Sequence, residues 1–193
     1  MYRMIHFDSI DSTHTWTKQN AHSLDPDQLT CVSAAEQTAG HGRFGRPWIS
    51  PKDQNIYASF YFTLQKDVPY LTNLAQVLSF SCVAVLKNQG FTPSIKWPND
   101  ILLDGKKVAG ILCELLFLEN SVGVVLSIGL NVNMSADYLR TVDQPATSLM
   151  QVSGHPWQME PLLSCLVEQF GSDLSRLKIE GFIGFWENYK NFF

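Results

Sequence analysis

The sequence lacks the features that mark membrane, secreted and general nucleic-acid-binding proteins. No apolar run approaches the roughly 18 residues that a membrane-spanning helix needs, and the first residues lack the apolar centre of a signal peptide. Asp and Glu (18) outnumber Lys and Arg (14), which gives a formal net charge of −4, whereas nucleic-acid binders usually carry a basic excess. We therefore expect a cytoplasmic protein with no membrane or nucleic-acid partner.

Cysteine is also scarce, and several familiar catalytic motifs are missing. None of the four cysteines stands in a Cys-x-x-Cys pair, and each lies in or beside an apolar run, so free buried thiols are expected at Cys31, Cys82, Cys113 and Cys165. The sequence has no P-loop, no metal-ligand spacing among its histidines and no Gly-x-Ser-x-Gly elbow. These absences remove the usual signals of P-loop NTPases, zinc enzymes and α/β-hydrolases.

The composition is that of one folded domain. The chain has 193 residues, of which 45% are hydrophobic and 17% charged, a balance too apolar for a disordered chain. We expect residues 1–193 to form a single domain. Because the expected strands occur in adjacent runs with few helices between them, the pattern favours an α+β fold over a doubly wound one. That fold would have a mixed, largely antiparallel β-sheet with flanking helices.

Periodicity places the individual elements. Apolar and β-branched runs predict strands over 1–7, 29–34, 56–64, 94–97, 99–103, 108–118 and 122–132. Three- and four-residue spacing predicts helices over 12–20, 70–88 and 158–177, and a final short helix carrying Phe182, Phe185, Trp186 and Tyr189. Gly90 should end the second helix, and Asp104-Gly105 is typical of a two-residue hairpin turn.

The expected loop over 37–51 contains the stretch Gly40-His41-Gly42-Arg43-Phe44-Gly45-Arg46. It matches the spacing G-x-G-x-x-G, but in a dinucleotide-binding fold these glycines open a helix, and the prolines that follow here exclude one. The glycines instead leave backbone N–H groups free for a ligand. Arg43 and Arg46 provide charged forks for carboxylate or phosphate oxygens, and Trp48 offers a flat face to a purine. A flexible surface loop with unconnected arginines is the alternative.

A second segment combines cations with a carboxylate in β surroundings. Lys96-Trp97-Pro98-Asn99-Asp100 leads into the expected hairpin, and Lys107 follows its turn. Strict alternation places Lys107 and Ala109 on one face of the strand and Val108 and Gly110 on the other. Lys107 is then a candidate partner for an anion and Asp100 a candidate Mg²⁺ ligand. An ordinary charged hairpin is the alternative.

Gly129-Leu130-Asn131 stands at the end of a β segment. Glycine and asparagine there mark a turn or a close approach of the backbone. Asn131 is therefore either a turn residue or a group that orients a phosphate or an adenine.

Taken in order, these segments resemble the catalytic domain of biotin protein ligases. Members of that family carry an Asp-Ser-Thr-Asn start, a Gln-x-x-Gly-Arg-Gly-Arg loop, a Lys-Trp-Pro-Asn-Asp strand, a Lys-x-Ala-Gly-Ile-Leu strand and a Gly-Ile-Asn turn. The counterparts here are Asp11-Ser12-Thr13-His14, Gln37 to Arg43, Lys96 to Asp100, Lys107 to Leu112, Gly129-Leu130-Asn131 and, further along, Pro145 to Leu149. The resemblance implies a class II aminoacyl-tRNA synthetase-like catalytic domain.

The resemblance also implies a ligase reaction. ATP, accompanied by Mg²⁺, would activate biotin as biotinyl-5′-adenylate, and a lysine of a carrier domain would then accept the biotinyl group. The implied partners are biotin, ATP and the biotin carboxyl carrier domain of acetyl-CoA carboxylase or a similar enzyme. A homodimer is a further partner that the resemblance leaves open.

Roles for individual residues follow from their positions in the matching motifs. Lys107 and Arg43 take the catalytic roles. The biotin-binding positions are Ser12, Thr13, His14, Gln37, His41, Gly42, Arg43, Lys107 and Gly110. The ATP-binding positions are Arg43, Arg46, Trp48, Lys107 and Asn131, and Asp100 is the Mg²⁺ candidate.

The chain departs from the family pattern in several places. His14 stands where the family commonly has Asn, and His41 and Phe44 replace arginines of the loop. An N-terminal DNA-binding domain and a small C-terminal β domain are expected to be absent. The alternatives are a lipoate or octanoate ligase or transferase of the same superfamily, and a non-catalytic protein that senses biotin.

Overall fold

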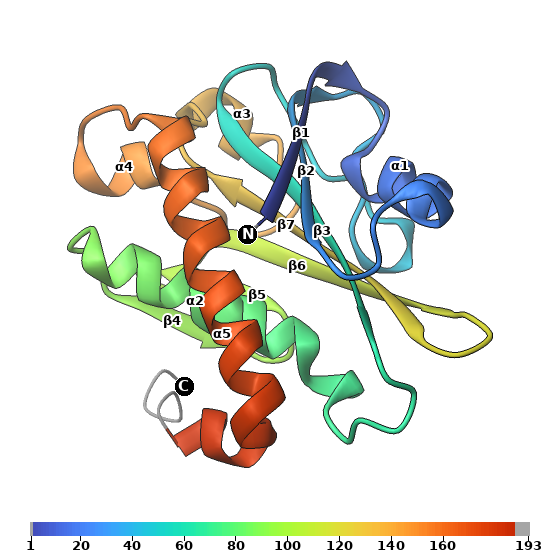
Figure 1. Ribbon diagram of the computed structural model, residues 1–193. Helices are drawn as coiled ribbons and strands as arrows, with labels where there is room; N and C mark the ends of the chain where they lie inside the picture. Colours follow the sequence, from blue (N-terminus) through green and yellow to red (C-terminus); the bar gives the residue numbers. More distant parts are fainter. Residues whose placement is uncertain (1, 188–193) are drawn as a thin grey trace.

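A seven-stranded mixed sheet forms the centre of the molecule in the computed structural model, which describes residues 2–187 (Figure 1). The strand order is β1-β2-β3-β7-β6-β5-β4. Only the pair β1–β2 is parallel among the paired strands of the described residues, and the other pairs are antiparallel. The strands are β1 (Tyr2–Ile10), β2 (Leu29–Gln37), β3 (Asn55–Leu64), β4 (Pro93–Lys96), β5 (Asp100–Leu103), β6 (Lys106–Phe117) and β7 (Val122–Asn131). The expected largely antiparallel sheet and all of its strands are confirmed.

The central strand β7 shows how alternation gives the sheet two different faces. Its residues Val124, Leu126, Ile128 and Leu130 belong to the main hydrophobic core. Residues two apart on the opposite face are Val125, Ser127, Gly129 and Asn131, since side chains of a strand alternate between faces. The first face is fully apolar and the second becomes polar and open toward the end of the strand. The sequence of β7 therefore directs the core to one side and leaves room for a site on the other.

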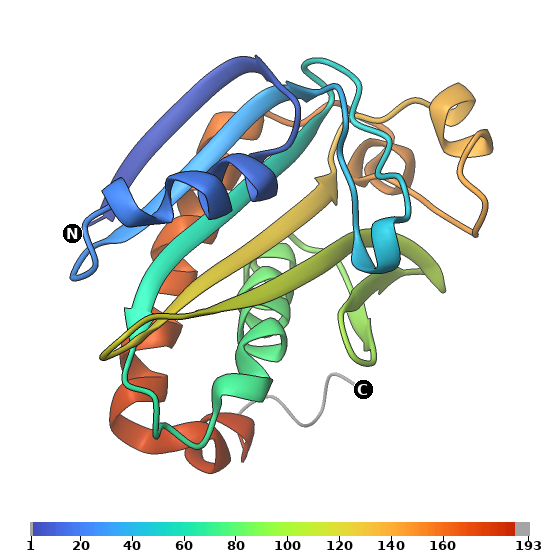
Figure 2. The same ribbon diagram turned by 90° about the vertical axis from the view of Figure 1, so that its right-hand side faces the viewer.

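Helices cover the two faces unequally. Helix α2 (Leu74–Asn88) and helix α5 (Met159–Glu187) pack on the apolar face, whereas α1 (Thr13–Asn20) lies on the other face beside the loop over 37–51 (Figure 2). The Ser12 hydroxyl caps α1 by accepting from the Thr15 N–H. Gly90, with φ of 88°, follows α2 as expected.

The C-terminal helical segment is continuous except at one residue. Gly181 adopts φ of 67° within α5, and the expected final short helix with Phe182, Phe185 and Trp186 follows this break. Tyr189 lies outside the described residues. The short helices α3 (Ala136–Arg140) and α4 (Leu149–Ser153) were not predicted, because five residues are too few to show helical periodicity.

The hairpin between β5 and β6 confirms one prediction and corrects another. Asp104 and Gly105 both have positive φ, 49° and 72°, as a two-residue turn of this kind requires. The pairing register, however, shifts between Ile101 and Leu102, which face Ala109 and Lys107. Val108 is thus the extra residue of a β-bulge. The expected separation of Lys107 from Gly110 on opposite faces is wrong, because the bulge returns Lys107 to the side of Gly110.

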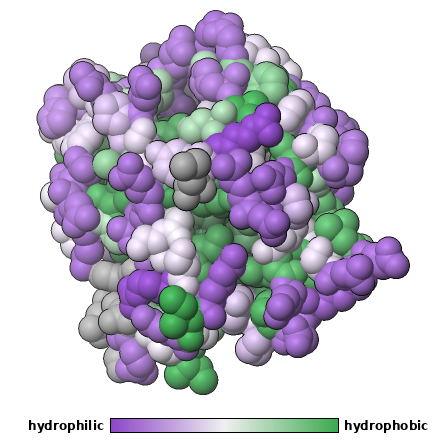
Figure 3. Space-filling model, in the orientation of Figure 1, coloured by the Kyte–Doolittle hydropathy of each residue, from purple (hydrophilic) through white to green (hydrophobic). Residues whose placement is uncertain are grey.

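The cysteines and the surface agree only partly with expectation. Cys31 and Cys82 are buried, and burial raises the pKa of each thiol to about 12, so they are unreactive core residues. Cys113 is half-buried, and Cys165 is exposed, so the expectation of a buried thiol at Cys165 is wrong. None of the helices within residues 2–187 combines the length and hydropathy that crossing a bilayer requires. The face that carries α5 mixes polar and apolar side chains (Figure 3).

Candidate active site

A pocket of about 340 Å³ opens on the face of the sheet that α1 and the loop over 37–51 partly cover. Its floor comes from β6 and β7, one wall from the start of α1, and another from the loop. The residues 141–146, which follow α3, close it on a further side. The pocket therefore lies where segments far apart in the sequence meet above the polar end of β7.

The candidate residues named from the sequence converge on this pocket. Those that line it are Ser12, His14, Gln37, His41, Gly42, Arg43, Arg46, Trp48, Asp100, Lys107, Gly110 and Asn131. Thr13 is the exception, because it is buried directly behind the wall, where its hydroxyl donates to Gln37 Oε1 at 3.1 Å. The alternative of unconnected loop arginines and an ordinary hairpin does not explain this convergence.

The glycine-rich loop folds back on itself at the pocket mouth. Trp48 N–H donates to the Gly40 carbonyl at 2.9 Å, and Gly42 N–H donates to the Arg46 carbonyl at 2.8 Å. A side chain at Gly40 would be 2.7 Å from Ser50 Oγ and 2.8 Å from the Trp48 carbonyl, so only glycine fits there. Phe44, at the tip, has φ of 58° and an exposed fraction of 88%. The loop thus holds its base firmly and presents an exposed tip.

The two loop arginines are exposed at the pocket mouth. Arg43 donates from Nη1 to Asn99 Oδ1 at 3.3 Å, which connects the loop to the segment before β5. Its guanidinium carbon lies 5.2 Å from the centre of the Phe44 ring. The remaining N–H groups of Arg43 are available to an anion entering the pocket.

Lys107 supplies a cation inside the pocket. Its Nζ forms an ion pair with Asp100 Oδ1 at 2.7 Å and lies 5.2 Å from the centre of the Trp48 ring. Both members of the pair are largely buried, with side-chain exposures of 15% and 18%. Asp100 is therefore engaged by Lys107, and the part of the chain that the structure describes contains no group of three or more metal-ligating side chains. The Mg²⁺ role of Asp100 stays a prediction.

Trp48 lies against the glycines of the sheet. A Cβ on Gly129 would overlap the Trp48 indole, and one on Gly110 would lie 3.1 Å from it. The lack of a side chain at Gly110 and Gly129 thus leaves the space that the Trp48 ring occupies. Its Nε1–H is buried against Gly129 and has no hydrogen-bond partner within residues 2–187. Asn131 donates to the Thr147 carbonyl at 3.0 Å and so holds the segment behind the pocket in place.

His14 is the most unusual polar residue of the wall. It is 4% exposed, its Nδ1 lies 2.7 Å from Ser127 Oγ, and its Nε2 lies 3.2 Å from Glu114 Oε2. Burial lowers the pKa of His14 below its ordinary value, against the opposing effect of Glu114. The other oxygen of Glu114 is 2.5 Å from Lys18 Nζ, and this hydrogen bond lowers the pKa of the Glu114 carboxyl.

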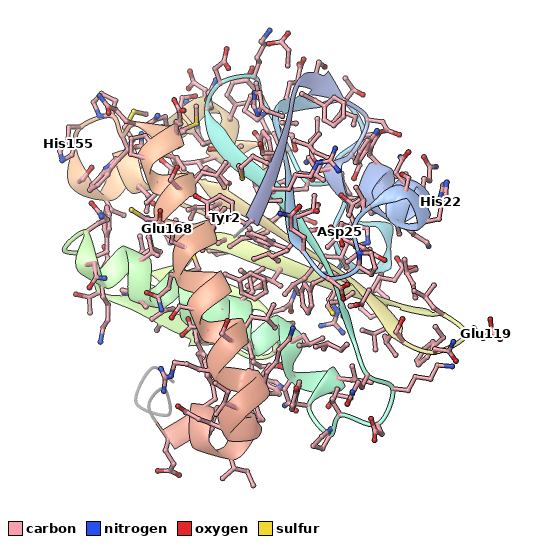
Figure 4. All side chains as sticks on the ribbon, viewed as in Figure 1. Tyr2, His22, Asp25, Glu119, His155 and Glu168 are labelled. Carbon is pink, nitrogen blue, oxygen red and sulfur yellow. The ribbon has the colours of Figure 1, made fainter. Side chains whose placement is uncertain are left out.

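Only some of the histidines belong to the site. The rings of His14 and His41 meet edge to face with centres 5.9 Å apart. His22 and His155 project from the surface elsewhere (Figure 4). The prediction that placed His14 and His41 together is thus consistent with their geometry.

Several pocket residues were missed by the sequence reasoning. They are Ser127, Leu112, Met134 and the segment formed by Thr141, Val142, Asp143 and Gln144. Ser127 had a usable signal, because it is a lone hydroxyl in the apolar run Val122 to Ile128 and shares its face with Gly129. The segment after α3 had none, since nothing in its sequence indicates which surface a loop will cover.

The arrangement separates two chemical environments in one pocket. Near α1 and β7, uncharged hydroxyl and amide groups of Ser12, Gln37 and Ser127 face the cavity. Near the loop and β6, Lys107, Arg43 and Arg46 provide positive charge beside the flat face of Trp48. Such a pocket suits a ligand with a neutral polar head at one end and anionic oxygens at the other.

Comparison with known proteins gives a consistent result. The family model described as "Biotin/lipoate A/B protein ligase family" matches residues 6–133. The chain is 35% identical over 195 residues to the bifunctional ligase/repressor BirA of Bacillus spizizenii, an alignment covering 96% of this chain and 59% of the relative. It is 31% identical over 158 residues to biotin--[acetyl-CoA-carboxylase] ligase of Paracoccus denitrificans, covering 78% of this chain and 65% of the relative. The chain thus spans about three fifths of the length of these relatives.

A solved structure is similar as well. The biotin protein ligase from Aquifex aeolicus in complex with biotin and ATP matches with a TM-score of 0.76 and 29% identity, covering 94% of this chain and 74% of that one. This likeness confirms the expected class II aminoacyl-tRNA synthetase-like arrangement of the sheet and helices.

Proposed function

The chain belongs to the biotin/lipoate A/B protein ligase family, and from that premise we propose that it attaches biotin to a lysine of a carrier protein. The reaction proceeds through biotinyl-5′-adenylate and uses ATP. Support comes from the pocket, where a neutral polar wall and a cationic region lie side by side. The relative named as a biotin--[acetyl-CoA-carboxylase] ligase and the similar structure of a biotin protein ligase with biotin and ATP support the same reaction.

In the first step the carboxylate of biotin attacks the α-phosphate of ATP, and pyrophosphate leaves. Both reactants are anions, so positive groups must offset their repulsion in the transition state. Lys107, whose ammonium lies within the pocket next to Asp100 and the Trp48 ring, would supply one such group. Arg43 adds a charged fork from the loop.

In the second step the amine of the carrier lysine attacks the acyl carbon of the adenylate, and AMP leaves as its bond to that carbon breaks. The attacking amine loses a proton as the amide forms. No protein nucleophile is required, which agrees with the absence of a reactive cysteine in the pocket among the described residues. The loop excludes water that would hydrolyse the adenylate.

Residues at the pocket indicate where nucleotide and metal would bind. Trp48 and Asn131 mark the adenine side, and Arg46 lies at the mouth near the expected phosphates. Mg²⁺ commonly binds through one or two carboxylates together with substrate phosphates. Asp100 is the carboxylate that would hold it, and Mg²⁺ supplies charge neutralisation to the phosphates when bound.

The polar wall would bind the ureido ring of biotin. Ser12, Gln37 and Ser127 line it directly, with Thr13 behind Gln37. His14, His41, Gly42 and Gly110, which also line the pocket, are the remaining residues that would contact biotin. We place the reaction in the cytoplasm, because the four free cysteines favour a reducing compartment.

The single observation that carries this proposal is the position of Lys107, a largely buried ammonium that lines the pocket beside the Trp48 ring. There it can meet both the carboxylate of biotin and the phosphate of ATP. A cation in this position can offset the negative charge of both groups when they combine to form an acyl-adenylate.

The decisive experiment incubates the chain with biotin, MgATP and the apo carrier domain of acetyl-CoA carboxylase. Mass spectrometry should find one biotinyl group on a carrier lysine, and none when ATP is omitted. Parallel reactions with lipoate and octanoate test the related activities, and faster transfer of either would replace biotin as the substrate. Biotin binding without transfer to any carrier would identify a sensor instead of a ligase.

A further inference from the structure

Behind the pocket wall, side chains form one hydrogen-bonded chain whose direction is fixed by the backbone. The Thr13 N–H donates to Gln37 Oε1 at 2.9 Å, so the amide oxygen of Gln37 faces Thr13. The amide nitrogen of Gln37 therefore donates the other way, to Ser50 Oγ at 3.1 Å. Ser50 in turn donates to the Trp48 carbonyl at 2.9 Å. Neither backbone group can change its role, so Gln37 cannot flip.

Because the Gln37 end is fixed, the direction in which each of the following hydroxyls donates is also fixed. Gln37 Oε1 only accepts, so the Thr13 hydroxyl must donate to it at 3.1 Å. Each hydroxyl has a single proton, so Ser59 must donate to Thr13 at 2.8 Å. Ser127 must then donate to Ser59 at 2.7 Å. The next contact, 2.7 Å between Ser127 Oγ and His14 Nδ1, is a hydrogen bond only if Nδ1 carries the proton.

The other ring nitrogen of His14 has a similar requirement. Its Nε2 lies 3.2 Å from Glu114 Oε2. Lys18 holds the pKa of Glu114 below its ordinary value, so this carboxyl is ionised and can only accept. Nε2 must therefore also carry a proton. With the hydroxyls donating in this order, only the doubly protonated imidazolium satisfies both contacts, and a neutral ring leaves the chain one proton short.

The charged groups around His14 do not all favour the imidazolium. Glu114 from β6 favours it, whereas Lys18 from α1 and His41 from the loop oppose it, and burial opposes it most strongly. The pKa of His14 is consequently lowered. Near neutral pH the ring is neutral, and the proton that would complete the chain is missing.

A neutral His14 ring disrupts one contact of this network, and which contact is lost depends on the ring nitrogen that carries the proton. With the proton on Nε2, Ser127 turns its hydrogen toward Nδ1, and the three oxygen–oxygen contacts from Ser127 to Gln37 then share only two hydrogens. One of the contacts at 2.7, 2.8 and 3.1 Å loses its hydrogen bond. With the proton on Nδ1, the Nε2 lone pair faces the Glu114 carboxylate. Either defect disturbs the wall that carries Gln37 and Ser127.

We propose that His14 is a positioning residue whose protonation completes this chain and prepares the pocket wall, so that biotin binding is coupled to uptake of a proton. This inference rests on the proposed function for the identity of the ligand. When the chain is complete, Gln37 Oε1 accepts from both the N–H and the hydroxyl of Thr13, which holds the Gln37 amide in the pocket wall. The affinity for biotin should therefore increase as the pH falls from about 7.5 to about 5.5, by roughly fivefold, since one coupled proton gives at most tenfold for each unit of pKa difference.

The first test uses the ligand-free protein and so does not depend on the ligand. Nitrogen-15 chemical shifts of the histidine rings are followed through a pH titration, with His14 assigned by the variant His14→Asn. We expect both ring nitrogens of His14 to become protonated below the ordinary histidine range. Ser127→Ala should leave Nδ1 without its acceptor and lower the titration midpoint further. An unchanged midpoint in Ser127→Ala, or a ring that stays neutral down to about pH 5, overturns the proposal.

The second test measures the linkage by calorimetry of biotin binding in buffers of different ionisation enthalpy. The wild-type chain should take up a fraction of a proton, and His14→Asn, which keeps an N–H₂ donor but cannot titrate, should take up none and lose the pH dependence of Kd. His22→Asn, an exposed histidine away from the pocket, is the matched control and should behave like the wild type. Proton uptake that is the same in His14→Asn contradicts the proposal. Absence of biotin binding by the wild type at any pH would instead contradict the proposed function, and the nitrogen shifts would still decide the role of His14.

Discussion

Lys107 and Asp100 form an ion pair of 2.7 Å across the bulged hairpin of β5 and β6, at the floor of the pocket. Each partner is largely shielded from solvent. Removing one member of such a pair leaves the other charge partly buried without compensation, which is usually more costly than removing both. The pair thus ties the stability of the pocket floor to the placement of the cation.

Replacing Lys107 should show whether this residue acts in the reaction or only stabilises the fold. We expect Lys107→Met to reduce adenylate formation by about a hundredfold, the size of effect seen when one charge-stabilising donor is removed. It should also lower the free energy of unfolding, because Asp100 loses its partner. The measurements are pyrophosphate release and denaturant unfolding.

The double variant Lys107→Met with Asp100→Asn provides the control. It should recover much of the lost stability without recovering adenylate formation. Recovery of both would mean that Lys107 acts only by holding the fold, and full activity of Lys107→Met would remove it from the mechanism.

Arg43 should control retention of the intermediate. Arg43→Gly removes a charge-assisted fork that contributes roughly 1.5–3 kcal/mol, so biotinyl-5′-adenylate should dissociate about ten to a hundred times faster. Stability should hardly change, because Arg43 is exposed and makes one long hydrogen bond to Asn99. Stopped-flow or rapid filtration of labelled adenylate measures the rate, and a rate equal to wild type would refute the assignment.

Gly129 should be required for the position of the Trp48 ring in the pocket. In Gly129→Ala the new methyl group would overlap the indole, so the ring must leave its position and the KM for ATP should rise. Gly171→Ala is a matched control on α5, where the added Cβ would meet Leu29 at an ordinary 3.6 Å. A normal KM for ATP in Gly129→Ala would show that the position of Trp48 does not matter for nucleotide binding.

Ligands should order the tip of the glycine-rich loop. The residues 40–46 include three glycines, which are costly to fix in one conformation, and Arg43 and Phe44 are exposed. Cleavage by trypsin after Arg43 should be rapid in the free protein and at least several-fold slower with biotin and ATP. Equal rates, measured by mass spectrometry of the fragments, would contradict ordering of the loop.

The fold and the site differ in how far they can be predicted from sequence. Strong alternation and apolar spacing located the strands and the long helices, since burial of one face decides both. The convergence of Ser12, Gln37, Lys107 and Asn131 depended on the order of motifs along the chain, because no local pattern shows that these residues meet.

Other features could not be predicted from local patterns. The side on which Lys107 emerges depends on the bulge at Val108, and a one-residue slip reverses every expectation from alternation. The proton requirement of His14 arises from contacts with Ser127 and Glu114, which are 113 and 100 residues away in sequence. Such relationships become visible only when tertiary distances are known.

The extra residue at Val108 also has a consequence for protein engineering. A strand of equal length without the same irregularity would present its lysine to the hydrophobic layer beneath the sheet, where α2 packs, and not to the reactants. Deleting Val108, in contrast, should leave Lys107 two residues from Gly110 and therefore on the same face of a regular strand. An engineered strand can thus lose the bulge and keep the orientation of the lysine only if it is also one residue shorter.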